Sequence, residues 1–387
     1  MKSKILFLFL PIILLVFVQC KTNKNGLVNQ KSNFEMGVPI LVGLENWSSC
    51  FGIYNTSPES PDGTKIAYVK ILSEQKERYD KMNGELWICN TDLTNHRKVI
   101  DLDNFITHNG VESQWIDNER IAFSTQGQLR IINLKGEDLI TPIKVFSIGH
   151  EPHNNKILYS AVSPKTNLYT IYEYDIATNQ STKIADASAF KEAINLFSIK
   201  DTTHIATRKI HHLAYSPDGT KIAFRADFAG KGEIDNHLIT MNKNGSDIQF
   251  FGPKPMHDHW YDNNSIMGHD NQIDDGNPND FSARRWTRKG EFIETLSGPG
   301  NHLSASPDRS LIATESWYKL APVILRVFKK GETTAFWQDT ISEDGKSVWT
   351  LGNHVNPAFS RDGKRVYYRK NTADGLTKTY MVVLPTK

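Results

Sequence analysis

The feature that most constrains this chain of 387 residues is a repeated motif that carries a histidine in a fixed place. The clearest copy reads HLAYSPDGTKIAF and begins at His212. His257 and His302 follow at intervals of 45 residues, each four residues before the serine of SPDG or its replacement. A repeat of this length is typical of one small supersecondary unit that is stacked several times.

Seven segments carry the motif, and each joins alternating residues, a turn of Pro, Asp, Asn or Gly, and a β-branched or aromatic strand. The segments begin at Ser57, Glu112, His150, His212, His257, His302 and Asn356. Further strand-like segments follow most copies, at 85–93, 128–136, 168–176 and 237–245. Seven units of two hairpins each close around an axis without exposed sheet edges. We therefore predict an all-β fold, a seven-bladed β-propeller of four-stranded antiparallel blades, over residues 38–387.

The first residues follow a different pattern. Lys2 and Lys4 precede an apolar run of about 14 residues, which is shorter than the roughly 20 that span a bilayer. Cys20 and a polar stretch follow the run. This order is typical of a bacterial lipoprotein signal, so we expect residues 1–19 to be a signal peptide and Cys20 to carry the lipid.

Residues 20–37 are expected to form a flexible tether because they are rich in Asn, Lys and Ser without periodicity. Phe17, Val18 and Gln19 differ from the small residues usual before a lipidated cysteine, so an ordinary secretory signal or a retained N-terminal anchor remains open. Each alternative places the propeller outside the cytoplasm. We expect a protein held to the cell envelope, in the periplasm or at the surface.

Charge and cysteine content limit the choice of partners. Removal of residues 1–19 leaves 43 basic against 43 acidic residues, so no net positive field would recruit nucleic acid. Cys50 and Cys89 remain in the folded part, and in an oxidising compartment they can pair. The sequence leaves that disulfide open.

The repeated histidines indicate a functional site. In a propeller the innermost strand of each blade lines the central channel, and equal offsets along a strand point side chains to the same face. His354 lies six residues before Ser360, which keeps it on that face as well. A single histidine beside a turn is more often a solvated loop residue, and duplicated blades also inherit residues by descent. Converging neutral imidazoles, however, bind divalent metals such as Mn or Zn.

The turns carry a resemblance to known repeats. SPDGTKIAY at Ser60, SPDGTKIAF at Ser216, SPDRSLIAT at Ser306 and SRDGKRVYY at Ser360 resemble the repeats of TolB-like and WD-like propellers. This resemblance covers most of residues 45–385 and implies the propeller fold. It leaves the function open, because propellers carry many chemistries.

A closer resemblance rests on the histidine segments. IHHLAYSPD (210–218), HDHW (257–260) and NHLSASPD (301–308) resemble the oligogalacturonate lyase group of seven-bladed propellers. The resemblance implies a manganese-type divalent ion, with His257 and His302 at metal-ligand positions and His212 as the catalytic base. The glutamine and the further histidine of that group are absent from 296–301, so we add His354, His259 or His269 as ligands that would complete the set.

Arg208 is the predicted carboxylate clamp. It lies four residues before His212, and its planar guanidinium suits a uronate carboxylate. Two main functions follow. The first is a polysaccharide lyase that cleaves an acidic oligosaccharide by metal-assisted β-elimination. The alternative is a non-catalytic, TolB-like propeller lipoprotein that binds envelope proteins or glycans, and a propeller with hydrolase activity stays open as a third.

Overall fold

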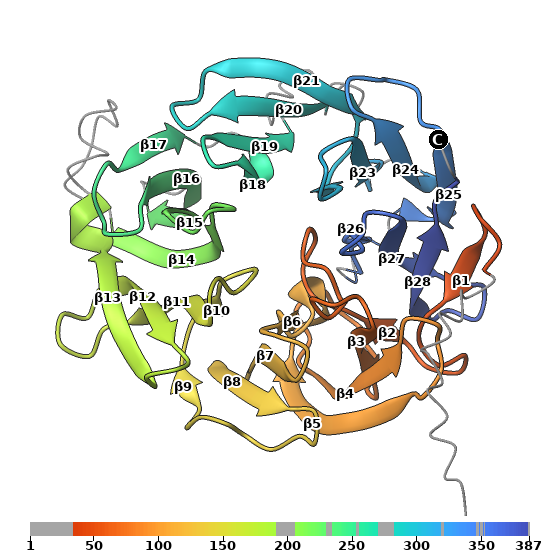
Figure 1. Cartoon of the computed structure of the whole chain (residues 1–387), viewed down its shortest axis with the longest axis horizontal. Coiled ribbons are helices and arrows are strands. Elements are labelled where there is room, and N and C mark those ends of the chain that lie inside the picture. The colour runs from red at the N-terminus through yellow and green to blue at the C-terminus, as the bar shows by residue number, and fades with distance from the viewer. Residues whose placement is uncertain are drawn as a thin grey trace, which may run out of the picture. The chain divides into compact units, whose positions relative to one another are not determined.

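Seven four-stranded antiparallel sheets, formed by the described residues, stand around a common axis in the computed structural model (Figure 1). This confirms the predicted seven-bladed propeller. The structure describes residues 34–190, 206–229, 234–252, 255–269, 282–318, 321–345, 348, 351 and 353–385. The first strand of each of blades 1 to 6 faces the axis and the fourth lies at the rim, as β5 and β21 show in Figure 1.

Each of the seven predicted segments contains the turn before the second strand of one blade and the start of that strand. Blade 1 has β2 (Ser49–Cys50), β3 (Lys65–Ile71), β4 (Met82–Asn90) and β5 (Arg97–Phe105), followed by the 3-10 turn η1 (Thr107–Asn109). Blade 2 has β6 (Gln114–Trp115), β7 (Arg120–Thr125), β8 (Gln128–Asn133) and β9 (Ile143–Lys144). Blade 3 has β10 (Ser147–Ile148), β11 (Lys156–Val162), β12 (Tyr169–Asp175) and β13 (Gln180–Asp186).

The next three blades are built in the same way. Blade 4 has β14 (Ala206–Tyr215), β15 (Lys221–Ala229), β16 (Ile234–Asn242) and β17 (Gln249–Gly252). Blade 5 has β18 (Met256–Asp262), β19 (Ser265–His269), β20 (Ser282–Thr287) and β21 (Phe292–Pro299). Blade 6 has β22 (Leu303–Ala305), β23 (Leu311–Glu315), β24 (Val323–Lys329) and β25 (Trp337–Ser342).

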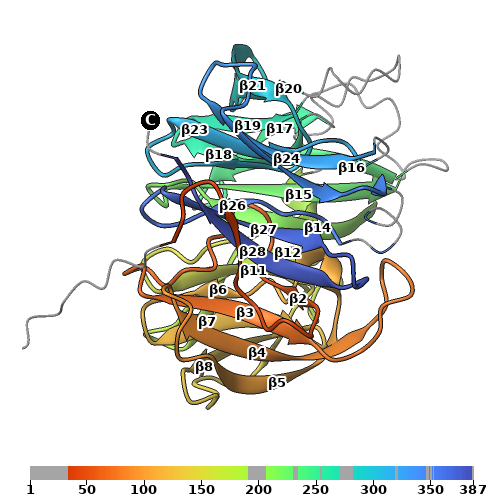
Figure 2. The same ribbon diagram turned by 90° about the vertical axis from the view of Figure 1, so that its right-hand side faces the viewer.

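Blade 7 closes the ring with strands from both ends of the folded part. It combines β26 (Ala358–Phe359), β27 (Arg365–Asn371) and β28 (Thr377–Val383) with β1 (Pro39–Leu41) at the rim. β1 pairs antiparallel with β28, with Ile40 opposite Met381. Figure 2 shows β26–β28 beside β2–β5 of blade 1. Main-chain pairing of distant segments therefore holds the ring shut.

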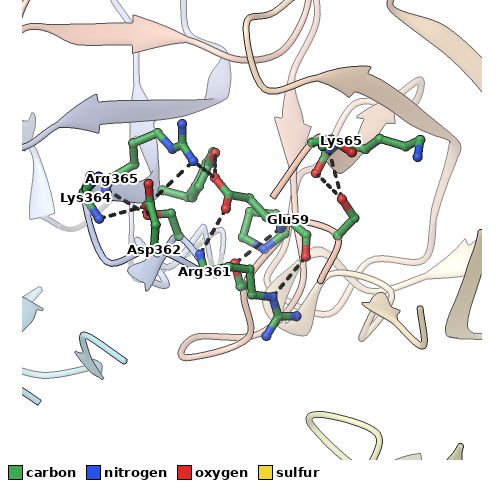
Figure 3. A network of polar contacts seen from close by, with 12 residues as sticks. Glu59, Lys65, Arg361, Asp362, Lys364 and Arg365 are labelled. Carbon is green, nitrogen blue, oxygen red and sulfur yellow. Dashed lines mark hydrogen bonds and ion pairs between the residues drawn. The ribbon is translucent and has the colours of Figure 1, made fainter. Parts of the chain in front are cut away.

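A buried carboxylate adds a second link between blades 7 and 1 (Figure 3). Glu59 is fully buried and accepts hydrogen bonds from the Tyr367 hydroxyl at 2.5 Å and from the backbone N–H of Arg361 at 3.0 Å. The Arg365 guanidinium lies 3.0 Å from the same carboxylate. This network spans the seam at which the ring closes.

The SPDG motif forms the turn between the first two strands of a blade. In blade 4 the Asp218 carboxylate accepts hydrogen bonds from the Ser216 hydroxyl at 2.7 Å and from the backbone N–H of Thr220 at 3.0 Å. The Ser216 hydroxyl in turn accepts one from the backbone N–H of Lys221 at 3.0 Å. Gly219 has φ +69°, a conformation that favours glycine. These hydrogen bonds and the glycine conformation give the physical reason why the motif recurs at this turn in several blades.

Several predictions made for the N-terminal part lie outside the described residues: the signal peptide, the lipidation of Cys20 and most of the tether. Among the described residues no helix is long and apolar enough to cross a membrane. Cys50 and Cys89 are both buried and unpaired.

Candidate functional site

Histidines from four blades surround Tyr54, a buried residue of the segment between β2 and β3. The distance from the centroid of its ring is 5.0 Å to His302, 5.6 Å to His257 and 6.1 Å to His212. Two further rings, those of His259 and His150, lie 5.8 and 6.0 Å away. The structure thus brings the three register histidines to one place in the channel, with Tyr54 between them.

His257, His302 and His354 form one continuous group, which we call the histidine trio. The ring centroids of His257 and His302 are 4.0 Å apart, and those of His302 and His354 are 4.7 Å apart. His354 Nδ1 lies 3.1 Å from His302 Nε2, and His257 Nδ1 lies 2.9 Å from His269 Nε2. Burial, ahead of neighbouring charges, holds the pKa of His257 and of His354 well below the ordinary value. These two imidazoles are therefore neutral.

A carboxylate fixes the orientation of His302. Glu315, at the end of β23, is fully buried and contacts His302 Nδ1 with its Oε1 atom. The Tyr318 hydroxyl donates to the same oxygen at 2.6 Å, and the backbone N–H of His302 does so at 3.2 Å. A carboxylate on Nδ1 favours a proton there and leaves Nε2 as a lone-pair donor toward His354.

The donor chemistry of the trio fits a divalent metal. Neutral imidazoles are common ligands of Mn and Zn, and the Glu315–His302 pair is the arrangement that orients a metal-binding histidine. His354 Nε2 is buried and has no hydrogen-bond partner among the described residues. Within the described ranges, however, no group of three or more His, Cys, Asp or Glu side chains is arranged so that it could hold a metal ion. The trio supplies suitable donors without a complete coordination geometry.

His212 lies in the wall of a cavity of about 460 Å³. Its Nδ1 atom is buried and has no hydrogen-bond partner among the described residues. Burial first, then the charges of His211 and His150, lowers its pKa well below the ordinary value. The ring is therefore neutral, as the predicted base must be before it acts, although the same burial makes it a weaker base. The cavity is lined by Phe105, His108, Glu112, Ser147, Lys209, His211, Asp227, Asn236 and neighbouring residues.

Glu112 faces the same cavity and was missed by sequence reasoning. Its carboxylate accepts hydrogen bonds from the Ser147 hydroxyl at 3.2 Å and from the backbone N–H of Ile148 at 3.3 Å. Burial raises its pKa to about 7, against the lowering effect of these two bonds. Glu112 occupies in blade 2 the place that His212 occupies in blade 4, so alignment of the repeats contained a signal for it.

Arg208, the predicted carboxylate clamp, lies on a strand with irregular pairing. β14 shifts register between Thr207 and Lys209 and again between His211 and Ala214. Each irregularity disturbs the alternation of faces on which the prediction depended. Lys209 is exposed and lines the cavity, whereas the side chain of Arg208 lies outside the described part of the chain.

His259, also predicted as a possible ligand, has its ring centroid 5.8 Å from that of Tyr54. It lines a different pocket of about 200 Å³, together with His150 and Arg309. His269 instead contacts His257 within the group. Glu315 and Tyr318 were also missed, but Glu315 could have been found by pairing residues about the blade 6 turn, since Leu303 faces Thr314.

Comparison with known proteins supports the fold. No family model and no curated protein matches the sequence. An oligogalacturonate lyase from Vibrio parahaemolyticus superposes with a TM-score of 0.61 at 14% identity, over 90% of this chain and 93% of that chain. An oligogalacturonate lyase in complex with manganese gives a TM-score of 0.63 at 13% identity, over 90% and 93%.

TolB from Acinetobacter baumannii is also similar, with a TM-score of 0.43 at 14% identity over 82% of this chain and 79% of that chain. The structural neighbours thus include both groups that the motifs resembled. At these identities the likeness shows the fold alone, and the TolB match is too distant to support further argument.

Proposed function

We propose that this protein is a polysaccharide lyase that cleaves uronate-containing oligosaccharides by β-elimination. The observation that carries the proposal is that His212 and Glu112 both line one cavity of about 460 Å³. One group is a neutral imidazole with an unpartnered nitrogen, and the other is a carboxyl group whose pKa is raised to about 7. Such a pair supplies a base and an acid at neutral pH.

The reaction would proceed as follows. His212 removes the proton α to the uronate carboxylate, the electrons of that C–H bond form the C4–C5 double bond, and the C4–O bond breaks. The departing oxygen takes a proton, which protonated Glu112 supplies. Lys209 lines the cavity and offers a positive charge to the substrate carboxylate. Charge placed on that carboxylate stabilises the enediolate that develops as the proton leaves.

His257, His302 and His354 are the residues that would hold a divalent ion of the manganese type. Such an ion, when bound, would neutralise the uronate carboxylate and so acidify the adjacent proton. The low-identity manganese-bound neighbour motivates this choice of ion. The chain's own part is to keep His257 and His354 neutral by burial and to orient His302 through Glu315.

The metal site can be tested apart from activity. Purified protein dialysed against Mn²⁺ and then against buffer is expected to retain one ion per chain by elemental analysis. The double variant His257→Asn, His302→Asn should lose that ion. Equal metal content in both proteins would remove the trio from the proposal.

The catalytic proposal is tested by incubating the protein with a panel of uronate glycans in the presence of Mn²⁺. We expect absorbance from the unsaturated uronate product to rise, and His212→Asn to lower kcat by about 10²- to 10⁴-fold with a folded structure. His96→Asn is the matched control, because His96 bonds to Tyr68 at 2.9 Å and lines neither pocket. No turnover on any glycan would contradict the lyase and favour a binding propeller with envelope proteins or glycans as partners.

We also propose that the protein is exported and lipid-anchored to the cell envelope through Cys20. The support is the order of Lys2 and Lys4, the apolar run and the cysteine in the sequence. Mass spectrometry of the N-terminal peptide from membrane fractions should detect acylated Cys20, and Cys20→Ser should shift the protein out of that fraction. An intact residue 1–19 segment on the mature chain would contradict this.

A further inference from the structure

A second pocket lies along the same inner strand as the first cavity. β14 contributes Lys209 and His212 to the first cavity, and Ala214 and Tyr215 to the second. The second pocket has a volume of about 200 Å³, several times that of one water molecule in the liquid, which is about 30 Å³. The proposed lyase chemistry does not use it.

Two buried histidines that line this pocket have ring nitrogens without a hydrogen-bond partner among the described residues. His259 is 3% exposed, and neither of its ring nitrogens has a hydrogen-bond partner among the described residues. His150 is 9% exposed, and its Nε2 atom also has no hydrogen-bond partner among the described residues. The backbone of His150 is fixed, since its N–H donates to Leu213 O at 2.8 Å and its carbonyl accepts from the Thr56 hydroxyl at 3.2 Å. Buried polar atoms without partners are rare in proteins, which points to a missing ligand.

Arg309 supplies the charge. It is half-buried, lines the pocket, and no hydrogen bond or ion pair joins its guanidinium to any residue in the described ranges. The ring of Tyr261 lies beside it, with its centroid 5.6 Å from the guanidinium carbon. The acid of the pocket, Glu151, is already paired, because its Oε1 atom lies 3.1 Å from Nη1 of Arg361. Glu151 and Asp262 attract Arg309 electrostatically, but no hydrogen bond from a described residue occupies its guanidinium, so its N–H donors are available to a ligand.

We propose that this pocket is a binding site for a small oxyanion, a carboxylate or a phosphate, held by Arg309 together with His150 and His259. A guanidinium fork donates two parallel hydrogen bonds to either group. Each neutral imidazole adds one N–H donor. A divalent cation is the poorer occupant, because Arg309 would repel it and only two imidazoles face the pocket.

The test is isothermal titration of the full chain with inorganic phosphate and, separately, with malonate, in low-salt buffer. We expect one anion per chain, and a Kd weakened at least tenfold by Arg309→Asn and by His259→Phe. Asn is chosen because Arg309 has φ +60°, which Asn tolerates. Binding by either probe supports the site, and their relative affinities assign it to phosphate or carboxylate.

Two controls locate the binding. Arg288→Asn removes the same charge from an arginine that pairs with Asp247 at 2.9 Å, and it should leave the Kd unchanged. Lys209→Met removes a positive charge that lines the first cavity and not the second pocket, and it should also leave the Kd unchanged. In the unmodified protein, NMR signals of the His150 and His259 rings should shift on titration. The proposal is overturned if neither anion binds, if Lys209→Met abolishes binding, or if Mn²⁺ rather than an anion shifts those signals.

Discussion

At the scale of single residues, burial in the first cavity favours the uncharged forms of two titratable groups. Burial lowers the pKa of His212 and raises that of Glu112 to about 7. Each shift has the same physical cause, because removal from water disfavours whichever form carries the charge. A pair of neutral groups, one able to accept a proton and one able to donate, is what β-elimination requires of the protein.

Glu112→Gln should therefore change two pH profiles. Lyase turnover should fall by about 10²- to 10⁴-fold at pH 6, and the decline of activity near pH 7 should disappear. Because the folded-state pKa is raised from 4.5 to about 7, the stability that Glu112 contributes is present below pH 4.5 and lost as pH rises through about 7. Chemical unfolding at pH 5 and pH 8 should show a smaller loss in Glu112→Gln than in the unmodified protein. Equal losses of stability in the two proteins would mean that Glu112 behaves as an ordinary surface carboxyl group.

At the scale of the strand, irregular backbone aims the histidines. His212 and His257 have φ +53° and +49°, and Glu112 and Asn356, at the equivalent places in blades 2 and 7, have φ +51° and +49°. β18 also shifts register between Met256 and His259. The same backbone irregularity thus recurs in blades 2, 4, 5 and 7, whereas His302 of blade 6 lies beside Tyr54 without it. The prediction for Arg208 instead depended on counting alternate faces within β14, whose register shifts twice.

Substitutions at His257 should separate the contribution of its side chain to stability from that of its backbone conformation. His257→Ala is expected to unfold at lower denaturant than His257→Asn, with a free-energy difference of about 1 kcal/mol, because Asn adopts left-handed φ more readily. The same two substitutions at His302, which is not among the residues with positive φ, form the control and should lack this Asn advantage. A similar advantage at both positions would attribute the effect to something other than backbone conformation.

At the scale of the whole molecule, ring closure depends on contacts between the first and last blades. β1 supplies the rim strand of blade 7, and Glu59 of blade 1 holds Arg361 and Arg365. Glu59 stands where blade 4 has Tyr215, in the place of an aromatic residue. A buried charge is kept there because arginine and tyrosine donors satisfy it.

Glu59→Ala should destabilise the protein by about 3–5 kcal/mol, because it leaves the Arg365 guanidinium without its buried partner. Denaturant unfolding followed by tryptophan fluorescence measures the change. Glu119→Ala is the comparison: its carboxylate pairs with Lys65 at 3.6 Å but is 73% exposed, so its loss should cost less than about 1 kcal/mol. Similar costs for the two variants would contradict a special role of the seam.

Acid should weaken the whole ring through its buried histidines. Burial lowers the pKa of His150 from 6.5 to about 4, so its unfolded form binds a proton that the folded form refuses. Stability is present above pH 6.5 and lost as pH falls toward 4, by on the order of 3 kcal/mol for this residue. His150→Asn should flatten the unfolding free energy over that window, whereas an unchanged slope would refute the assignment.

The sequence by itself determined the number of blades, the turns between their first two strands and the meeting of His212, His257 and His302. These features are repeated, so one local rule, the Ser–Asp–Gly turn, is copied along the chain. The tertiary structure alone decided that Glu112 and His212 line one cavity, that His259 lines another pocket and that Tyr54 stands among the rings. Those pairings join residues from different blades or depend on irregular strands, and such contacts exist only once the ring has closed.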